Sequence, residues 1–460
     1  MGFTDFGFWL ALLPVVALFH ALPGRWRPAW LLAASLAYFT IESGAYVLLL
    51  LASVGWVWAA GHRIARAETD RARLIWLWAG LVPAAGVLVL FKLGDAMPGI
   101  AAPLGISYYT FRLIAYLVEV YWDERQLAPG WLDFAAYVSF GPHMVSGPIQ
   151  RPGDFLPQLA ALRHRLDPAR IEGGLQMLLN GLMLKLIIGD RLAPLVNMVD
   201  GAPAAYARPA VWLAAVAHLP YLYADFAGYT LIALGLGALF GIAGPPNFNA
   251  PFAATNVAEY WRRWHMSLTG WLTDYVFMPL RMATRHWGRA GLVLSIFVNM
   301  VLVGLWHRIS GTYLVFGLVQ GAYVAVYTLW LAPRGGPARG TGQPLVALAK
   351  AVCVFVLMDA ALIVWFAPAL PSAATEARMV LGLLPPGPRL FEELPEGADI
   401  KAACIALVLA IYIGAGAPGM AAIRARLGRH VPGWAWVALK LLLISLLGQD
   451  NGGAFIYGHF

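Results

Sequence analysis

The stretch that decides how this chain folds is Glu259-Tyr260-Trp261-Arg262-Arg263-Trp264-His265-Met266-Ser267-Leu268, which sets three charges and a histidine between long apolar runs. A second tryptophan-histidine pair, Trp306-His307, ends the next strongly apolar segment. Ionisable groups are expensive to bury in apolar surroundings, and those that occur inside membranes are usually functional. We therefore expect the two histidines to line a buried reaction centre that the rest of the chain encloses.

The composition predicts that these surroundings are a membrane. Of the 460 residues, 60% are hydrophobic and only 12% are charged, and the mean hydropathy is +0.68. Soluble proteins carry about 25% charged residues, so this chain has too little polar surface to cover itself in water. The formal charge of +8 comes from Lys and Arg residues between apolar runs. Cytoplasmic loops explain that pattern better than a nucleic-acid partner does.

The apolar runs predict an all-α polytopic membrane protein whose 460 residues form a single membrane-embedded domain. We count about a dozen membrane segments against the ~20 apolar residues needed to cross a bilayer. Arginine-rich first and third linkers predict an N-terminus on the outer side. The expected helices are Phe6–Leu22, Trp30–Ile41, Tyr46–Ala60, Leu74–Phe91, Leu104–Tyr121, Ile171–Ile188, Val211–Tyr223, Gly228–Ile242, Gly291–Leu305, Thr312–Trp330, Val346–Phe366, Ala402–Ile413 and Trp434–Leu447.

Several segments depart from this simple pattern. Ser139–Pro152 is apolar but broken by glycine and proline. We expect a re-entrant or interfacial element that is buried in protein or lines a cavity. Val257–Leu280 is too polar for a lipid-facing span. Arg112 lies within an apolar run and should face away from lipid. Asp225 is interpreted as separating two helices, and Arg334–Gln343 as a polar loop.

His307 is the strongest candidate for chemistry. A neutral imidazole at the end of a membrane segment can accept a proton from a hydroxyl group and later return it to a leaving group. The alternative is a core histidine that is hydrogen-bonded to a carbonyl oxygen. His265 has the weaker individual case.

The charged neighbours of His265 have two interpretations. Arg262 and Arg263 could bind an anionic donor or polarise a carbonyl oxygen, or they could extend toward lipid phosphates. Glu259, Asp225 and Asp274 are candidate carboxylate partners that would orient a histidine ring and raise its basicity.

Other chemistry has no support in the sequence. There is no glycine-rich nucleotide loop, no His-Glu-x-x-His and no Gly-x-Ser-x-Gly, which argues against a nucleotide-driven pump, a zinc protease and a serine hydrolase. Cys353 and Cys404 are expected to be small buried hydrophobic residues. We expect no metal site and no bound cofactor.

Blocks spread along the chain resemble the membrane-bound O-acyltransferase family, specifically its bacterial branch with the membrane subunits of alginate O-acetyltransferase and teichoic-acid D-alanyltransferase. The most specific blocks are Asn247–Phe252, Glu259–Trp271 and Gly304-Leu305-Trp306-His307. Further similar blocks are Gly105–Arg112, Ser146–Ile149, Ile188–Pro194, Asp225–Tyr229 and Phe455–Phe460. The chain departs from the family after Pro279-Leu280, at Trp365–Pro368 and at Arg308.

The resemblance implies a ring of transmembrane and re-entrant helices around a central funnel. It implies that His307 is the essential active-site histidine and that His265 is the second histidine. It also implies transfer of an acyl group, most simply acetyl, from a cytoplasmic thioester to hydroxyl groups of a cell-envelope polysaccharide. The donor would be acetyl-CoA or an acyl carrier protein.

Further expectations from the resemblance are a periplasmic acyltransferase or esterase-like partner and a place in the bacterial inner membrane. D-alanyl transfer from a carrier protein remains an alternative within the family. A transporter or channel is the alternative from another class, and the lack of repeated halves argues against it.

Overall fold

A computed structural model describes residues 6–94, 102–164, 167–332, 344–389, 399–417 and 431–449. Within these ranges the regular structure is helical, apart from one isolated bridge between Tyr206 and Arg389. The predicted all-α class is therefore confirmed. The predicted loop 334–343 and the aromatic block 455–460 lie outside the described residues.

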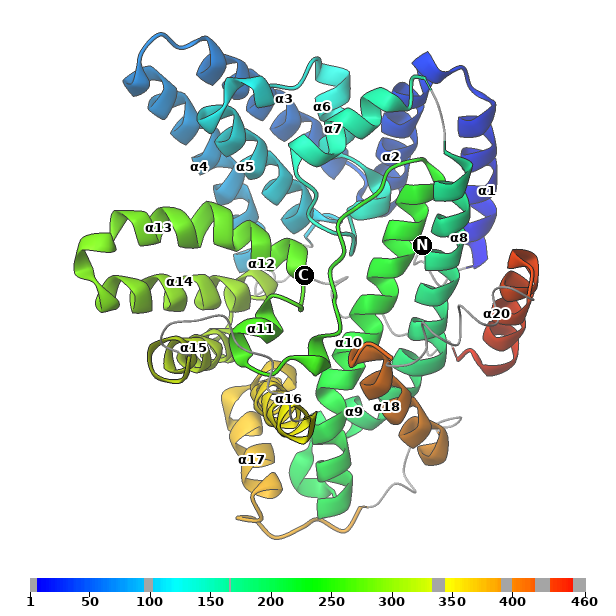
Figure 1. The fold of residues 1–460 in the computed structure, drawn as a ribbon, viewed down its shortest axis with the longest axis vertical. Coiled ribbons are helices and arrows are strands. Elements are labelled where there is room, and N and C mark those ends of the chain that lie inside the picture. The colour runs from blue at the N-terminus through cyan, green and yellow to red at the C-terminus, as the bar shows by residue number, and fades with distance from the viewer. Residues whose placement is uncertain are drawn as a thin grey trace. The chain divides into compact units, whose positions relative to one another are not determined.

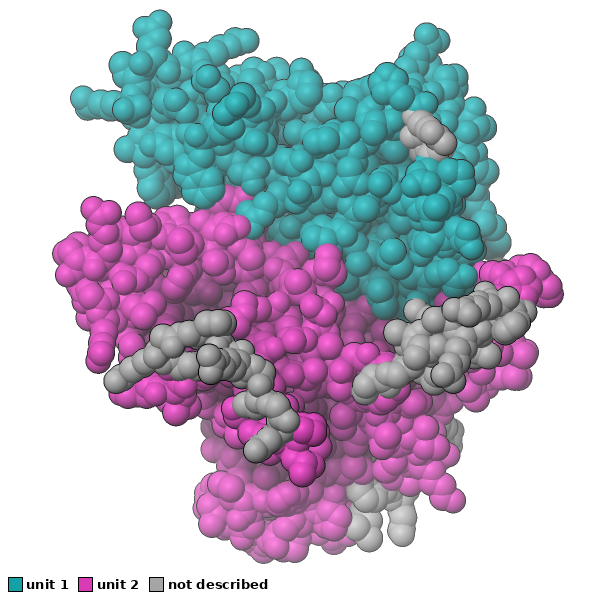
Figure 2. All heavy atoms as spheres, in the orientation of Figure 1, with its two compact units in different colours: residues 1–181, 229–245, 454–460 teal, residues 182–228, 246–453 magenta. Residues whose placement is uncertain are grey.

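The chain divides into two compact units, which Figure 2 colours separately. Unit 1 comprises residues 1–181, 229–245 and 454–460, and unit 2 comprises residues 182–228 and 246–453. The prediction of one domain stays a prediction.

Unit 1 begins with eight helices that are labelled in Figure 1. They are α1 (Phe6–Ala21), α2 (Arg27–Ser43), α3 (Tyr46–Arg66), α4 (Asp70–Gly94), α5 (Ile106–Trp122), α6 (Trp131–Val138), α7 (Pro152–Ala161) and α8 (Pro168–Met183). Long helix α10 (Arg208–Leu239) begins in unit 2 and ends in unit 1.

Apart from short 3₁₀ turns, unit 2 holds the remaining described helices, several of them short or continued by a π-helical turn. They are the π-helix η4 (Leu184–Gly189), α9 (Asp190–Asp200), α11 (Val257–Trp261), α12 (Met266–Leu272), the π-helix η7 (Thr273–Phe277), α13 (Met278–Ala283), α14 (Arg289–His307), α15 (Gly311–Val326), the π-helix η9 (Tyr327–Leu331), α16 (Pro344–Phe366), α17 (Leu370–Val380), α18 (Ile400–Gly414) and α20 (Gly433–Leu447).

Six described helices are long and apolar enough to cross a bilayer. Their outward faces carry large apolar side chains, for example Leu90 at 68% and Leu348 at 60% exposure. Lipid is the solvent that accepts such faces, so the chain is a multi-pass membrane protein. The six are Tyr46–Arg66, Asp70–Gly94, Arg208–Leu239, Arg289–His307, Gly311–Leu331 and Pro344–Phe366.

Helix α10 corrects one sequence prediction. Residues 211–223 and 228–242 were expected to form two helices separated by Asp225, but one helix runs through that position. The Asp225 carboxylate is fully buried and lies 2.7 Å from the Lys185 ammonium nitrogen. Because this cation offsets the cost of the buried carboxylate, the aspartate does not have to interrupt the helix to reach water.

The exposure of the cysteines corrects a second prediction. Cys353 on α16 and Cys404 on α18 are both exposed in the structure rather than buried. In a soluble protein an apolar side chain on a helix indicates the core. In a membrane protein the lipid-facing side is apolar as well, so composition alone does not say which way a small apolar side chain points.

The segment Ser139–Pro152 in unit 1, which glycine and proline interrupt, is mostly buried. Hydrogen bonds from Arg112 allow its irregular backbone to be buried. Arg112 lies on α5 and is 1% exposed. Its guanidinium donates to the backbone carbonyls of Tyr137 (3.0 Å), Val138 (3.2 Å) and His143 (3.2 Å). Irregular backbone leaves such carbonyls without helical partners, and burying them unpaired would be costly. The buried arginine therefore stabilises the non-helical turn.

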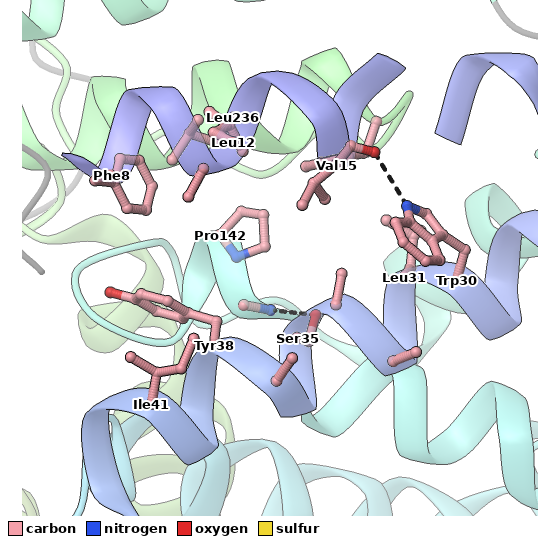
Figure 3. Close-up of a pocket in the computed structure, with 16 residues that line it drawn as sticks. Phe8, Leu12, Val15, Trp30, Leu31, Ser35, Tyr38, Ile41, Pro142 and Leu236 are labelled. Carbon is pink, nitrogen blue, oxygen red and sulfur yellow. Dashed lines mark hydrogen bonds between the residues drawn. The ribbon is translucent and has the colours of Figure 1, made fainter. Parts of the chain in front are cut away.

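An apolar pocket of about 400 Å³ lies in unit 1 between α1 and α2 (Figure 3). Two hydrogen bonds define its walls: Trp30 Nε1 donates to the Val15 carbonyl (3.0 Å), and the Gly141 amide donates to Ser35 Oγ (3.0 Å). None of the candidate site residues lines this pocket.

Close packing of α14 on α15 predicts a strong effect of one methyl group. A Cβ added at Gly304 would overlap the carbonyl oxygen of Tyr313, which is backbone and has little room to move. We expect Gly304→Ala to lower the free energy of unfolding by roughly 3 kcal/mol, at the upper end for overpacking. Thermal unfolding in detergent measures this. Gly311→Ala is the control, because its added Cβ would lie 3.6 Å from Leu370, an ordinary contact. Equal unfolding temperatures for the two variants would contradict the prediction.

Candidate functional site

His307 is the last residue of α14 and is enclosed by aromatic side chains. Its ring centroid lies 4.5 Å from that of Trp306 and 4.4 Å from that of Trp365 on α16. The ring of Tyr313, on α15, is nearly parallel to it at 6.4 Å. The side chain environment leaves His307 only 3% exposed. Three helices therefore fix this imidazole in apolar surroundings.

His265 lies at the start of α12 and approaches His307. Its backbone is left-handed, with φ of 43°, and the next two amides donate to Asn247: Met266 N to the Asn247 carbonyl (2.9 Å) and Ser267 N to its Oδ1 (3.3 Å). The two histidine rings are 6.5 Å apart between centroids. The structure thus brings together two residues that the sequence places 42 positions apart.

The surroundings of His265 set its protonation state. The side chain is 2% exposed, and the ring of Phe226 packs edge-on at 4.6 Å. His265 lies outside the six spanning helices. Burial lowers the pKa of His265 to about 3, because an apolar environment disfavours the charged ring. At neutral pH His265 is therefore a neutral imidazole, with one nitrogen that donates and one that accepts.

Arg263 and Glu259 pair with each other. Arg263 Nη2 lies 2.9 Å from Glu259 Oε1, and Arg263 Nη1 donates to the carbonyls of Asn249 (3.1 Å) and Ala250 (3.4 Å). Glu259 also accepts from the amide and hydroxyl of Thr255, each at 2.9 Å. Burial favours the protonated carboxyl, but the hydrogen bonds from Thr255 and Arg263 outweigh it and lower the pKa of Glu259. Both side chains thus fasten the turn that precedes Asn256.

The remaining predicted residues have different positions. Arg262 is exposed, and so is Asp274 on η7. Asp225 pairs with Lys185, while the next residue, Phe226, contacts His265. The expected carboxylate partner of a histidine therefore is not Glu259, whose oxygens bond to Thr255, Asn256 and Arg263.

The sequence interpretation missed three side chains that shape the site. Trp365 and Tyr313 pack against His307, and Asn247 holds the backbone beside His265. Asn247 lies in a block that was noticed only as part of a resemblance. Nothing in the spacing points to Trp365, which lies on α16, 58 residues after His307 in the sequence. Lys185 was also missed, although a lone lysine inside an apolar run is a signal.

The neighbouring arginines give a matched pair of variants. We expect Arg263→Ala to lower the free energy of unfolding by about 2 kcal/mol, since charged hydrogen bonds are lost. We expect Arg262→Ala to change it by less than about 0.5 kcal/mol, as for other exposed positions. Thermal unfolding of both variants in the same detergent measures the difference. A larger loss of stability for Arg262→Ala than for Arg263→Ala would contradict the geometry.

Comparison with known proteins identifies relatives. The family model of the membrane-bound O-acyltransferases matches residues 123–334. A probable alginate O-acetylase of Azotobacter vinelandii is 31% identical over 351 residues, which cover 71% of this chain and 68% of the relative. A peptidoglycan O-acetyltransferase of Helicobacter pylori is 27% identical over 341 residues, covering 65% and 64%.

A further relative is named for the transfer of D-alanine. The teichoic acid D-alanyltransferase of Streptococcus thermophilus is 28% identical over 305 residues, covering 63% of this chain and 72% of the relative. The alginate relatives are matched over about two thirds of their length, for example 66% for the Pseudomonas aeruginosa protein. Both histidines fall within the segment that the family model matches.

Proposed function

The chain belongs to the membrane-bound O-acyltransferase family, and from this premise we propose that it transfers acetyl groups from a cytoplasmic thioester to hydroxyl groups of a cell-envelope polysaccharide. The observation that supports this most directly is the approach of His265 and His307 to 6.5 Å inside an aromatic enclosure. Two imidazoles at this separation are close enough to contact one substrate group, because each reaches about 3 Å by hydrogen bonding.

In the proposed reaction His307 is the general base. It takes the proton from the acceptor hydroxyl, and the hydroxyl oxygen attacks the thioester carbonyl carbon. The tetrahedral intermediate collapses, the carbon–sulfur bond breaks, and the protonated His307 returns its proton to the departing thiolate. The acceptor hydroxyl belongs either to the polysaccharide or to a serine of a partner protein.

His265 and the neighbouring arginines have supporting roles in this proposal. A neutral His265 can donate one hydrogen bond to the developing oxyanion. Arg262, which is exposed, is free of the ion pair that occupies Arg263 and Glu259 and is the better candidate for binding an anionic donor. Asp225, paired with Lys185, would act by holding α10 and with it Phe226 against His265.

We propose acetyl-CoA or an acylated carrier protein as donor, and the bacterial inner membrane as location. Three arginines lie at the turn between α13 and α14: Arg281 on α13, Arg285 in the turn and Arg289 at the start of α14. Their charge suits the phosphates of either donor. A periplasmic acyltransferase or esterase-like protein is the expected partner, because the acceptor polymer lies outside the cytoplasm.

D-alanyl transfer from a carrier protein is the second candidate, and similarity to teichoic acid D-alanyltransferases favours it. The two candidates differ in the donor that acylates the acceptor. The test offers membranes containing the chain a radiolabelled acetyl donor, either acetyl-CoA or an acetylated carrier protein, and in a separate sample a carrier protein charged with labelled D-alanine. We expect label in the envelope polysaccharide only from an acetyl donor. Label from the D-alanyl carrier alone would establish the second candidate, and a chain that moves an unacylated solute in proteoliposomes would point to a transporter.

A further inference from the structure

A buried cluster of three ionisable side chains lies in unit 2, outside the proposed reaction centre. Asp200 ends α9, His218 lies on α10 and Glu376 lies on α17. His218 Nε2 is 2.9 Å from Asp200 Oδ1 and 3.8 Å from Glu376 Oε1. The three residues are 7%, 0% and 1% exposed, respectively. Two carboxylates thus converge on one ring nitrogen in a site closed to solvent.

Several polar atoms of this cluster lack hydrogen-bond partners. Among the described residues, Asp200 Oδ2, Glu376 Oε1 and His218 Nδ1 are buried and accept or donate no hydrogen bond. The nearby Asp359 does not supply one, because its Oδ1 accepts the Leu219 amide at 2.9 Å. In the described part of the chain, His218 is also the only basic group within 4.0 Å of either carboxylate. Buried carboxylates with so few donors are costly unless a cation compensates them.

We propose that Asp200, His218 and Glu376 bind one divalent transition-metal ion, with Zn²⁺ as the best fit. Imidazole nitrogen and carboxylate oxygen are preferred zinc ligands. The three potential ligand atoms lie within 4.8 Å of one another. Tetrahedral ligands bound at about 2.0–2.1 Å are about 3.3 Å apart, and the observed 2.9 and 3.8 Å lie on either side of that value. A neutral imidazole and two carboxylates also balance the charge of a dication.

The position of the cluster indicates a structural role for the ion. It joins α9, α10 and α17, which are separated in sequence. Phe366, at the end of α16, stacks on the His218 ring at 4.8 Å with an interplanar angle of 12°. Its neighbour Trp365 packs against His307. The ion would therefore fix the helices that carry one wall of the histidine site. This inference stands on the cluster alone and does not depend on the proposed acyl transfer.

The sequence predicted no metal site, because the three ligands share no motif and come from distant helices. Without an ion, His218 Nε2 and Asp200 Oδ1 are joined by one hydrogen bond at 2.9 Å, and Glu376 stands beside them. The two states differ in composition, so metal content decides between them.

The test uses the full-length chain, purified in detergent without a polyhistidine tag or chelator. After addition of ZnCl₂ and removal of excess ion, mass spectrometry of the metal should find one equivalent per chain. Chelation should lower the unfolding temperature, and ZnCl₂ should restore it. CoCl₂ added to the chelated protein should give the visible absorption of a bound Co²⁺.

Glu376→Gln and His218→Gln should lose the ion, whereas Glu172→Gln, at an exposed glutamate of α8, should keep it. Clearly substoichiometric metal in the wild-type chain, or wild-type metal content in both ligand variants, would overturn the proposal. The wild-type measurement remains decisive even where His218→Gln does not fold.

Discussion

Replacing His307 with glutamine is expected to lower acyl transfer by about 10²–10⁴-fold, the range that general base catalysis contributes. Glutamine keeps a polar side chain of similar reach but cannot take the proton from a hydroxyl group. His307 is enclosed by Trp306, Trp365 and Tyr313, so no bulk water has easy access to replace the base. The measurement is transfer of labelled acetyl groups to envelope polysaccharide in membranes that contain equal amounts of folded protein.

His164→Gln is the matched control, because this histidine is exposed and lies in unit 1. It should retain wild-type transfer. Unfolding temperatures of both variants show whether the fold survives. A folded His307→Gln variant that transfers acetyl groups at the wild-type rate would exclude His307 as the base. His265→Gln separates the two histidines: a smaller loss than for His307 is expected if His265 only stabilises the oxyanion.

Replacing Lys185 with methionine is expected to lower the free energy of unfolding by about 3–5 kcal/mol, the typical loss when one partner of a buried ion pair is removed. The Lys185 ammonium nitrogen lies 2.6 Å from Asp190 Oδ1 and 2.7 Å from Asp225 Oδ1, and all three side chains are at most 3% exposed. Without the cation, two carboxylates remain close together in a dry site. Denaturation in a detergent–SDS mixture measures the loss.

Two further variants define the cause of that loss. Lys401→Met removes an exposed lysine and should change stability by less than about 0.5 kcal/mol. Adding Asp190→Asn and Asp225→Asn to Lys185→Met should restore part of the stability, because neutral amides need no buried counter-charge. If Lys185→Met unfolds no more easily than Lys401→Met, the ion pairs do not stabilise the fold.

Measuring both stability and acyl transfer for Asp225→Asn decides the role of Asp225. The sequence analysis proposed Asp225 as a carboxylate partner of a histidine, whereas the structure pairs Asp225 with Lys185. A structural role predicts that Asp225→Asn loses stability and activity together. A role at the reacting atoms predicts a folded variant with lower transfer, so the ratio of the two effects distinguishes them.

Much of the fold follows from hydropathy along the chain. The predicted apolar runs 46–60, 74–91 and 291–305 lie within helices 46–66, 70–94 and 289–307, which are long enough to span a bilayer. Helices form there because the backbone in lipid has to satisfy its own hydrogen bonds. The broken segment before Pro152 was expected to be buried, and Arg112 supplies the donors that permit it. The prediction that Asp225 separates two helices was wrong. A buried charge interrupts a membrane helix only where no opposite charge pairs with it, and here Lys185 does.

The candidate site was likewise predictable only in part. Composition and hydropathy were enough to predict an all-α membrane protein. They also pointed to His265 and His307, because charged and imidazole groups inside apolar runs can be recognised without a structure. The partners of the buried polar side chains became clear only from the packed helices: Trp365 lies beside His307, Arg263 pairs with Glu259, and Lys185 lies between two aspartates. The same holds for Asp200, His218 and Glu376, which meet from three helices. Periodicity and composition show which segments form apolar helices. Contacts between side chains of helices that are distant in sequence depend on tertiary packing, which no local pattern predicts.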